Sequence, residues 1–485
     1  MMRSLKDILF GVSLVSIHGE RDIEISGLTF DSRKVTKGSL FFAVKGLTVD
    51  GHDYLDKAIE KGAMAMLCEE LPQTLSEGIT YIQVENSAAA MGVVAANFFS
   101  HPSKNLKLVG ITGTNGKTTT ATLLHQLFIN LGYKVGMLST VENKIEHRVL
   151  PASYTTPDSI QLNELLAEMV AEGCTHCFME VSSHALVQER VAGIEFAGAV
   201  FTNISHDHLD YHETFDAYIS AKKRLFDGLN SSAFALVNID DKRGRIMLQN
   251  TKADQLTYSV KAMADFKAKI IHNTIQGLEL DINGVNAWFR LIGDFNAYNL
   301  LAVYATAVLL EEDKIDVLTA LSELEGARGR FEMVPNKNQI LAIVDYAHTP
   351  DALENVLKTI DNLRTRQETL ITVVGCGGNR DKTKRPKMAR IAAGFSNKII
   401  LTSDNPRNED PAEILKEMMA GIPKVDQKKT MIIQDRREAI RTACNLAEAN
   451  DIILVAGKGH ETYQEIKGVR NHFDDKEILN EMLNS

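Results

Sequence analysis

"LKLVGITGTNGKTTTATLLHQLF", residues 106–128, is the stretch that decides the fold of this chain. Its first six residues are mainly apolar and predict a buried strand, and residues 118–128 place apolar side chains at helical spacing. Gly113 and Gly116 lie between these two segments. The pattern therefore predicts a strand, a tight glycine loop and a helix in direct succession.

The loop carries the residue types that bind phosphate in ATP-using proteins. Backbone N–H groups of such a loop, together with the N-terminus of its helix, attract an anion. Lys117 can reach the β- and γ-phosphates of ATP, and the Thr118 hydroxyl can ligate Mg²⁺. Gly110 stands one position too early for the usual G-x-x-x-x-G-K-[ST] pattern, in which Ile111 would be glycine. An ordinary glycine-rich turn is the alternative, but Gly-Lys-Thr in this context favours ATP.

Composition sets the outer limits on fold and function. The 485 residues are too many for one hydrophobic core and predict several domains. A formal net charge of -10 argues against a nucleic-acid partner, because a phosphate backbone would require a basic surface. No segment of the sequence approaches the roughly 20 apolar residues that a membrane span needs.

Cysteine usage indicates a reducing compartment. The five cysteines are an odd number scattered along the chain, which fits a cytoplasmic location better than a disulfide framework. Cys174 and Cys177 form a C-x-x-C pair, but a zinc ribbon would need a second pair. A redox motif would open a helix, whereas the segment around this pair is predicted to be a strand. We therefore expect buried structural thiols.

Alternating strand and helix patterns predict an α/β protein of three domains. Residues 1–103 mix short strands with helices. Residues 104–334 alternate apolar runs of strand length with helices, which predicts a doubly wound, mainly parallel sheet. Residues 335–485 repeat the alternation and predict a Rossmann-like α/β domain. A dinucleotide site is disfavoured there, because the third glycine of its fingerprint would fall on Arg380.

Two polar clusters follow predicted strands of the central domain, where ligands collect in open α/β sheets. In "FMEVSSHALVQER", residues 178–190, Glu180 ends an apolar strand and is a candidate Mg²⁺ ligand. A serine hydrolase is disfavoured there, since the G-x-S-x-G elbow is missing. In "TNISHDHLDYH", residues 202–212, three histidines and Asp207 could suggest zinc. Their spacing matches no closed zinc site, and the phosphate loop favours Mg²⁺.

Charged residues also gather on loops after apolar strands of the C-terminal domain. They lie in "VDYAHTPD" (344–351), "GCGGNRDKTKRPKM" (375–388), "TSDNPRNEDP" (402–411) and "VAGKGHETY" (455–463). Solvated surface charge is the alternative for any one of these residues. Because ligands collect at the carboxyl ends of strands in such sheets, the set indicates a binding site.

Together these motifs resemble those of the Mur ligase family, the ATP-dependent amide-forming enzymes of bacterial cell-wall precursor synthesis. The match spans essentially the whole chain and is closest to the MurE type. "DSRKVTKGSLFFAVKG", residues 31–46, resembles the uridine-nucleotide module of the family. The other motifs follow in family order: "GTNGKTTT" (113–120), "EVSSHAL" (180–186), "TNISHDHLDYH" (202–212), "GDFNAYN" (293–299), "GRFE" (329–332), "DYAHTPD" (345–351), "SDNPR" (403–407) and "GKGHE" (457–461).

The resemblance implies what each domain does. Residues 1–103 would form a UDP-substrate-binding α/β domain, residues 104–334 an ATP-binding P-loop domain, and residues 335–485 an amino-acid-binding domain. MurE-type members add the third residue of the peptide to UDP-N-acetylmuramoyl-L-alanyl-D-glutamate, through an acyl phosphate. The implied partners are small molecules, with no nucleic acid and no membrane span, and a monomer is expected.

The resemblance also implies the residues of the ATP site. Lys222 in "SAKKRLF" matches the family's carbamylated lysine, and a carbamate made from CO₂ is an anion that can bind Mg²⁺. The catalytic residues would be Lys117, Lys222, His208 and Arg330. The ligands of the magnesium ions would be Thr118, Glu180, His208 and Lys222. ATP would contact Gly113, Thr114, Asn115, Gly116, Lys117, Thr118, Thr119, Asn299, Arg330 and Asp345.

Two substrate sites follow from the same resemblance. The UDP-muramoyl dipeptide would contact Ser32, Thr155, Thr156, Ser182, Gln188 and Arg190. The incoming amino acid would contact Arg380, Asp404, Asn405, Pro406, Arg407, Gly457 and Glu461.

The "DNPR" motif, residues 404–407, bears on which amino acid is added. Members that take meso-2,6-diaminopimelate have a similar motif, whereas lysine-adding members usually lack its arginine. Diaminopimelate carries a second carboxylate that lysine lacks, and a guanidinium group binds a carboxylate through two hydrogen bonds. We therefore expect meso-diaminopimelate as the substrate of this chain.

Three alternatives remain open at this point. The same reaction with L-lysine is the nearest. A folylpolyglutamate-type ligase shares the phosphate loop, but it should lack the uridine module and the "DNPR" motif. A P-loop protein that only senses ATP would have no evident need for Glu180, His208 and Lys222.

Overall fold

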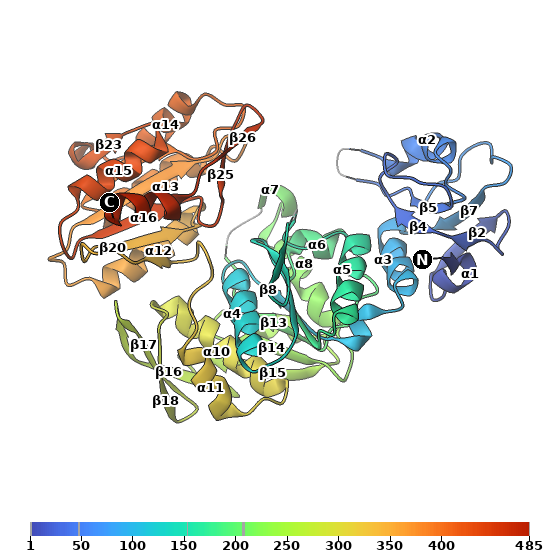
Figure 1. The fold of residues 1–485 in the computed structure, drawn as a ribbon, viewed down its shortest axis with the longest axis horizontal. Coiled ribbons are helices and arrows are strands. Elements are labelled where there is room, and N and C mark those ends of the chain that lie inside the picture. Colours follow the sequence, from blue (N-terminus) through green and yellow to red (C-terminus); the bar gives the residue numbers. More distant parts are fainter. Residues whose placement is uncertain (1, 47–48, 153, 206–208, 485) are drawn as a thin grey trace.

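The computed structural model describes residues 2–46, 49–152, 154–205 and 209–484, and it consists of three units, each built around its own β-sheet (Figure 1). The unit nearest the N-terminus and the unit nearest the C-terminus lie on opposite sides of the central one. Helix α3 (Ser87–Phe98) of the N-terminal unit packs against α5 (Ser159–Ala171) of the central unit. In the described ranges, every helix is too short or too polar to cross a lipid bilayer.

The central sheet has eleven strands in the order β11-β10-β9-β12-β8-β13-β14-β15-β16-β17-β18. All pairings from β9 through β16 are parallel, and the strands at both ends of the sheet pair antiparallel. Their bounds are β8 Lys107–Thr112, β9 Val135–Leu138, β10 Asn143–Ile145, β11 Arg148–Leu150, β12 His176–Glu180, β13 Gly198–Phe201, β14 Phe234–Asn238, β15 Asp254–Ser259, β16 Phe266–Thr274, β17 Gly277–Ile282 and β18 Val285–Phe289.

Helices cover both faces of this sheet, so the expected doubly wound architecture is confirmed. Buried side chains of α4 (Lys117–Asn130), α10 (Asp294–Leu309) and α11 (Lys314–Ser322) form the apolar core on one face. Those of α5 and α8 (Phe215–Asp227) form the core on the other. Short helices α6 (Ser183–Val187), α7 (Leu209–His212) and α9 (Gly244–Met247) complete this unit.

The C-terminal unit has a six-stranded sheet in the order β19-β20-β24-β21-β22-β23. All its pairings are parallel except that of β19 with β20. Helices α12, α13 and α14 pack on one face and α15 and α16 on the other. The bounds are β19 Glu332–Val334, β20 Leu341–Asp345, α12 Pro350–Leu363, β21 Leu370–Cys376, α13 Lys384–Phe395, β22 Lys398–Ser403, α14 Pro411–Met419, β23 Thr430–Ile432, α15 Arg436–Leu446, β24 Ile452–Ala456, β25 Tyr463–Ile466, β26 Val469–His472 and α16 Asp475–Asn484.

The N-terminal unit has a five-stranded sheet in the order β2-β7-β6-β5-β4, with α1 and α3 on one face and α2 on the other. The bounds are β1 Arg3–Ser4, α1 Leu5–Ile8, β2 Leu14–His18, β3 Glu24–Ile25, β4 Gly27–Thr29, β5 Ser39–Phe42, α2 Leu55–Glu60, β6 Ala65–Cys68 and β7 Thr80–Val84. The predicted boundary after residue 334 stays a prediction, and β19, which ends at that residue, already pairs with the C-terminal sheet.

All five cysteines are free thiols. Cys177 lies inside β12, as the sequence predicted, whereas Cys174 lies before the strand begins at His176. Burial raises the pKa of the Cys174 thiol to about 11. Both thiols are buried and keep their protons at neutral pH, which fits a structural role.

Candidate active site

The glycine loop lies between β8 and α4, as the sequence predicted. Gly113 has a φ of +153°, and a Cβ at this position would lie 1.9 Å from the Thr202 hydroxyl oxygen, so no other residue fits there. Lys117 Nζ donates hydrogen bonds to the carbonyl oxygens of Gly113 and Thr114, at 3.0 and 2.9 Å. Thr118 and Thr119 follow in the first turn of α4 and are both buried. This arrangement places an amine and a helix N-terminus at the loop.

Neighbouring side chains hold the rest of the loop in shape. The backbone N–H of Asn115 donates to Asn203 Oδ1 at 3.0 Å, and the Thr202 hydroxyl donates to the Asn115 carbonyl at 2.7 Å. Asn203 and Thr202 follow β13, the strand beside β8. The loop is therefore held in place by the segment that follows the adjacent strand.

Glu180 is a fully buried carboxylate at the carboxyl end of β12. Its Cα pairs with Ile111 of β8, so it lies directly beside the start of the glycine loop. Its oxygens accept hydrogen bonds from the backbone N–H and the hydroxyl of Thr140, at 2.8 and 3.2 Å. Among the described residues, no cationic group lies within 4.0 Å of these oxygens. A buried carboxylate needs a compensating positive charge, and carboxylate and hydroxyl oxygens are the donors that Mg²⁺ prefers, so the residues fit this ion.

Lys222 reaches the same loop from α8. The side chain is only 1% exposed, and Nζ donates to the Gly113 carbonyl at 2.8 Å. Nζ also lies 4.5 Å from the centre of the Tyr218 ring. Three of the four predicted metal ligands, Thr118, Glu180 and Lys222, thus border the loop. The fourth, His208, lies outside the described residues.

Arg330 joins the central unit to the C-terminal one. Its Nη2 donates to the Thr118 hydroxyl at 3.3 Å, and its guanidinium lies 4.6 Å from the centre of the Tyr346 ring. The Tyr346 ring in turn lies 4.8 Å from the His460 ring. Burial lowers the pKa of His460 to about 3, so this imidazole is neutral at physiological pH. Through these contacts the carboxyl edge of the C-terminal sheet adjoins the glycine loop.

Asp345 and Asn299 lie on either side of this junction. Asp345 ends β20 and accepts hydrogen bonds from the backbone N–H groups of Phe331 and Ala347, each at 2.7 Å. Burial raises the pKa of the Asp345 carboxyl, although the Arg330 charge acts in the opposite direction. Asn299 Oδ1 would lie 2.6 Å from a Cβ at Gly116, so the Asn299 amide borders the glycine loop.

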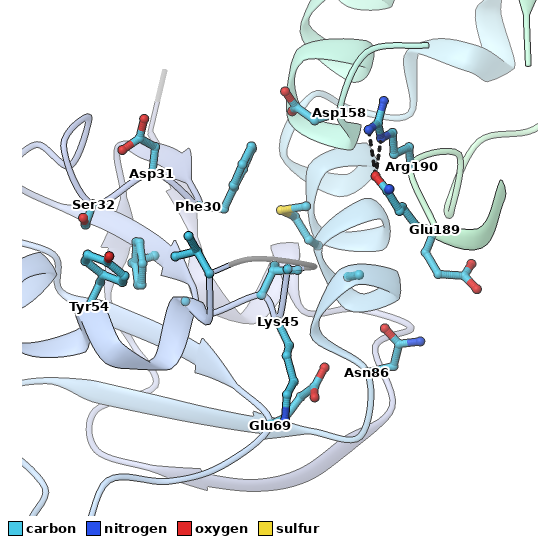
Figure 2. A pocket seen from close by; sticks show the side chains of 18 of the residues that line it. Phe30, Asp31, Ser32, Lys45, Tyr54, Glu69, Asn86, Asp158, Glu189 and Arg190 are labelled. Carbon is cyan, nitrogen blue, oxygen red and sulfur yellow. Dashed lines mark hydrogen bonds between the residues drawn. The ribbon is translucent and has the colours of Figure 1, made fainter. Parts of the chain in front are cut away.

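A cavity of about 1330 Å³ lies between the N-terminal and central units (Figure 2). Ser32 lines it from the N-terminal unit, and Gln188 and Arg190 line it from the central unit. Arg190 donates to Gln188 Oε1 at 2.7 and 3.1 Å, and its guanidinium lies 4.9 Å from the centre of the Tyr154 ring. Figure 2 shows Phe30, Ser32 and Tyr54 facing Asp158 and Arg190 across the cavity.

The other residues predicted to contact the UDP-substrate do not line this cavity. The Thr156 hydroxyl donates to the Glu180 carbonyl at 2.9 Å and accepts from the Ser182 N–H at 3.1 Å. The Ser182 hydroxyl caps α6, and the Thr155 hydroxyl accepts from Thr140, which also contacts the Glu180 carboxylate. These three residues therefore gather at the carboxyl end of β12, near the glycine loop.

The C-terminal residues Asp404, Asn405 and Glu461 surround Lys458, a cation that the sequence analysis placed among the charged loops but to which it gave no role in the site. The Lys458 side chain is fully buried, and Nζ lies 3.0 Å from Asn405 Oδ1, 3.1 Å from Glu461 Oε2 and 3.7 Å from Asp404 Oδ1. The Asn405 amide also donates to Glu461 at 2.8 Å. Gly457 adjoins the cluster, since a Cβ there would lie 3.0 Å from Asp404 Oδ2.

Burial and neighbouring charges shift the pKa values of the two carboxyl groups in this cluster. Burial by itself would raise the pKa of Asp404, but the positive charges of Lys458 and Arg436 outweigh it, and the pKa is lowered. Burial, together with the charge of Asp404, raises the pKa of Glu461. Arg436 is itself paired with Asp475 at 2.8 Å, so Asp404, Glu461 and Lys458 leave a net charge of about -1 when both carboxyl groups are ionised, which suits one further ammonium group. The cluster can therefore bind an amine.

Replacing Lys458 with methionine should destabilise the protein by about 3 kcal/mol, because the buried Asp404 and the half-buried Glu461 then lose the cation that they share. In the variant Asp404 and Glu461 would bind protons more readily in the folded state than in the unfolded state. The free energy of unfolding of the variant should therefore rise as pH falls. Urea unfolding at pH 6 and pH 8 measures both effects.

A lysine on the surface of the same unit provides the control. Lys416 is exposed and pairs with Glu413 at 3.3 Å, so Lys416→Met should change the free energy of unfolding by less than about 0.5 kcal/mol. A Lys458→Met variant as stable as this control would contradict the importance given to the buried cation.

Arg407 and Arg380 lie on neighbouring loops at the same edge of the sheet. Arg407 Nη1 donates to the Gly378 carbonyl at 2.9 Å, whereas Arg380 is exposed and its Nη1 donates to the Asn379 carbonyl at 3.2 Å. A Cβ at Gly377 would lie 2.9 Å from Arg407 Nη1 and 3.9 Å from Arg380 Cγ, so both side chains flank Gly377. Pro406 packs on Gly378, where a Cβ would lie 1.9 Å from its carbonyl oxygen.

Three family models match the chain, one in each unit. Residues 24–100 match "Mur ligase family, catalytic domain", residues 111–307 match "Mur ligase middle domain", and residues 329–459 match "Mur ligase, glutamate ligase domain". The matches follow the order of the three sheets along the chain.

Curated relatives and solved structures are similar over the full length. A UDP-N-acetylmuramoyl-L-alanyl-D-glutamate–2,6-diaminopimelate ligase from Cytophaga hutchinsonii is 61% identical, and one from Bacteroides fragilis is 54% identical. Each alignment covers 99% of this chain and 99% of the relative. A solved structure of a ligase with the same name has a TM-score of 0.72 and 33% identity, covering 100% of this chain and 99% of that one.

Proposed function

The chain belongs to the Mur ligase family, and from this premise we propose how its residues perform the reaction of that family. It is an ADP-forming ligase of peptidoglycan precursor synthesis, which joins meso-2,6-diaminopimelate to the D-glutamate of UDP-N-acetylmuramoyl-L-alanyl-D-glutamate. The observation that carries the residue assignments is the Arg330–Thr118 hydrogen bond. Together with the contacts from Arg330 to Tyr346 and from Tyr346 to His460, it supports an ATP site next to the charged loops of the C-terminal sheet.

The reaction has two chemical steps. The terminal carboxylate of the dipeptide attacks the γ-phosphorus of ATP, which forms an acyl phosphate and releases ADP. The amine of diaminopimelate then attacks the acyl carbon, and phosphate leaves. A carboxylate is a poor acyl donor, so phosphorylation supplies the leaving group that amide formation requires.

Charges at the glycine loop favour the first step. Lys117 and Arg330 offset the negative charge on the phosphoryl group during transfer. When bound, Mg²⁺ supplies additional positive charge, and Thr118, Glu180, His208 and a carbamylated Lys222 would hold it. Asn299 and Asp345, which border the loop and the junction, would position ATP.

The cavity of Figure 2 would hold the UDP end of the dipeptide substrate. Its volume of about 1330 Å³ is large enough for a nucleotide sugar. Ser32, Gln188 and Arg190 line it, and Arg190 offers a cation for the diphosphate. Thr155 and Ser182 lie farther along, near Glu180, where the peptide end would reach the ATP site.

The amino-acid site would combine the acidic cluster with the arginine pair. Asp404 and Glu461 would bind an ammonium group of diaminopimelate, and Arg407 with Arg380 would bind its distal carboxylate. Lysine lacks that carboxylate and would leave Arg407 without its anion, so it would be a poor substrate.

Phosphate release from the purified protein tests the whole assignment. With Mg-ATP and the UDP-muramoyl dipeptide, we expect rapid release upon addition of meso-diaminopimelate and little upon addition of L-lysine. Equal release with lysine would keep the ligase but overturn the role given to Arg407. Release with neither amino acid would contradict the ligase assignment, and release that needs no dipeptide would favour a simple ATPase.

We further propose that the protein acts in the cytoplasm as a monomer. The free, buried thiols and the use of ATP fit a reducing compartment. Each residue that the family resemblance implies for the three substrate sites is present in this chain, which supports the proposal of a monomer.

A further inference from the structure

Two loops at the carboxyl edge of the C-terminal sheet are bonded to each other. One follows β21 and contains Gly378, and the other follows β22 and contains Arg407. The Gly378 N–H donates to the Asn405 carbonyl at 2.9 Å, and the Asn408 N–H donates to Asn379 Oδ1 at 3.1 Å. The Arg407 side chain also bonds the first loop, since its Nη1 donates to the Gly378 carbonyl. Its direction therefore depends on where the first loop lies.

A fully buried arginine, Arg385, lies beneath this pair of loops. Its guanidinium donates to both carboxylate oxygens of Glu409 at 3.0 Å, to Glu417 at 2.7 Å and to the Gly377 carbonyl at 3.3 Å. Glu409 also accepts a hydrogen bond from the backbone N–H of Asn379. The hydrogen bonds to Arg385 and Asn379 hold the pKa of Glu409 at about 2, so it is ionised at any pH of interest. Glu409 is thus the one anion among the described residues that bonds both Arg385 and the backbone of the first loop.

The backbone of Arg407 is held separately from its side chain. Its φ of +52° is in the left-handed region, which costs a non-glycine residue about 1 kcal/mol. The Arg407 N–H donates to the Glu465 carbonyl at 3.0 Å, and the Lys467 N–H donates to the Arg407 carbonyl at 2.7 Å. The β25–β26 hairpin therefore fixes where the side chain starts, and Gly378 determines where its end points.

We propose that Glu409 is a positioning residue for amino-acid selection: by bonding Arg385 and Asn379 together, it holds Gly378 where Arg407 can present its guanidinium to the distal carboxylate of the substrate. The inference rests on the proposed function of Arg407 and extends it by one residue. The Glu409 carboxylate is bonded to Arg385 and to the Asn379 N–H, so it would act through Arg407.

The test compares Glu409→Gln with Glu417→Gln. Both changes remove one negative charge from the same buried arginine, and both carboxylates also lie within 4 Å of Lys382 Nζ, at 3.5 Å from Glu409 and 3.9 Å from Glu417. Only Glu409 accepts a backbone hydrogen bond from the first loop. In Glu409→Gln the amide must turn its NH₂ toward one of the donors that the carboxylate accepted, so the loop shifts. We expect KM for diaminopimelate to rise about 10- to 100-fold and the preference over lysine to fall similarly, with KM for ATP within about twofold. Glu417→Gln should leave all three values within about twofold.

Two further variants make the outcome decisive. Glu409→Asp keeps the negative charge and should recover part of the preference for diaminopimelate over lysine. If Glu409→Gln fails to fold, Glu409→Asp serves as the test variant in its place. In an Arg407→Ala background, Glu409→Gln should add little, because the residue it positions is gone. Equal effects of Glu409→Gln and Glu417→Gln on the preference for diaminopimelate would overturn the proposal. A full effect of Glu409→Gln in the Arg407→Ala background would also overturn it. Wild-type protein without diaminopimelate-dependent phosphate release would instead overturn the proposed function.

Discussion

Replacing Lys222 with alanine should lower the rate of diaminopimelate-dependent phosphate release by about 100- to 1000-fold. The side chain is buried and its Nζ lies 2.8 Å from the Gly113 carbonyl, so any anion formed on this nitrogen would lie at the glycine loop. The variant loses the carbamate that we propose as a ligand of the phosphate-bound metal. It also leaves a space where a short carboxylate can bind. Added formate or acetate should therefore restore part of the rate, measured as phosphate release at saturating substrates.

The neighbouring Lys223 provides the matched control. It is half-buried on the same helix but bonds Asp227 rather than the glycine loop, so Lys223→Ala should keep most of its activity and show no response to formate. ¹³C NMR of the wild-type protein in ¹³C-bicarbonate should show a carbamate signal that Lys222→Ala lacks. Full activity of Lys222→Ala, or loss of activity with no carboxylate rescue and no carbamate signal in the wild type, would contradict the role of Lys222.

The parts of the fold that depend on local sequence could be predicted. The run of apolar residues before Gly113 and the helical spacing after Lys117 are β8 and α4, and the glycines between them take conformations that only glycine adopts easily. Helix α10, which carries the "GDFNAYN" motif, begins at Asp294, and the Asn296 side chain in its first turn donates to the Ile292 carbonyl at 2.9 Å.

Contacts between distant segments could not be predicted from local pattern. Arg330 and Thr118 are 212 residues apart, and Lys458 and Asn405 are 53 residues apart. Nothing in the sequence around Lys458 distinguishes a buried cation from a solvated one. Lys458 is close to Asn405 because β24 and β22 belong to one sheet, and the loops that follow these strands lie at the same edge of it.

The residues predicted to contact the UDP-substrate lie partly in the cavity and partly at the carboxyl end of β12. This separation also depends on contacts between distant segments. The Thr156 hydroxyl bonds the backbone at Glu180 and Ser182, and the Thr156 carbonyl accepts a hydrogen bond from Arg190 Nη1 at 2.8 Å. Thr156 therefore links the segment that carries the buried carboxylate to Arg190, although Thr156 does not itself line the cavity. Tyr154, which the sequence analysis did not assign, lies against Arg190 in that cavity.

Replacing Arg407 with alanine should lower kcat/KM for diaminopimelate by roughly 100- to 1000-fold, because the distal carboxylate of the substrate would lose its charged partner in a partly buried site. Use of lysine should change much less, since lysine has no carboxylate to lose. The ratio of the two kcat/KM values should therefore collapse, while KM for ATP stays within about twofold. Phosphate release with each amino acid, at fixed Mg-ATP and dipeptide, measures all three quantities.

Arg437 serves as the control for the loss of an arginine. It lies in the same unit, on α15, and pairs with Glu481 at 2.6 Å on the surface, so Arg437→Ala should leave the ratio unchanged. Arg407→Lys should recover little, because an ammonium group is a point charge and cannot form the two parallel hydrogen bonds of a guanidinium. If Arg407→Ala kept the wild-type preference, the distal carboxylate would have to be bound elsewhere. Arg380, on the other side of Gly377, would then be the residue to change.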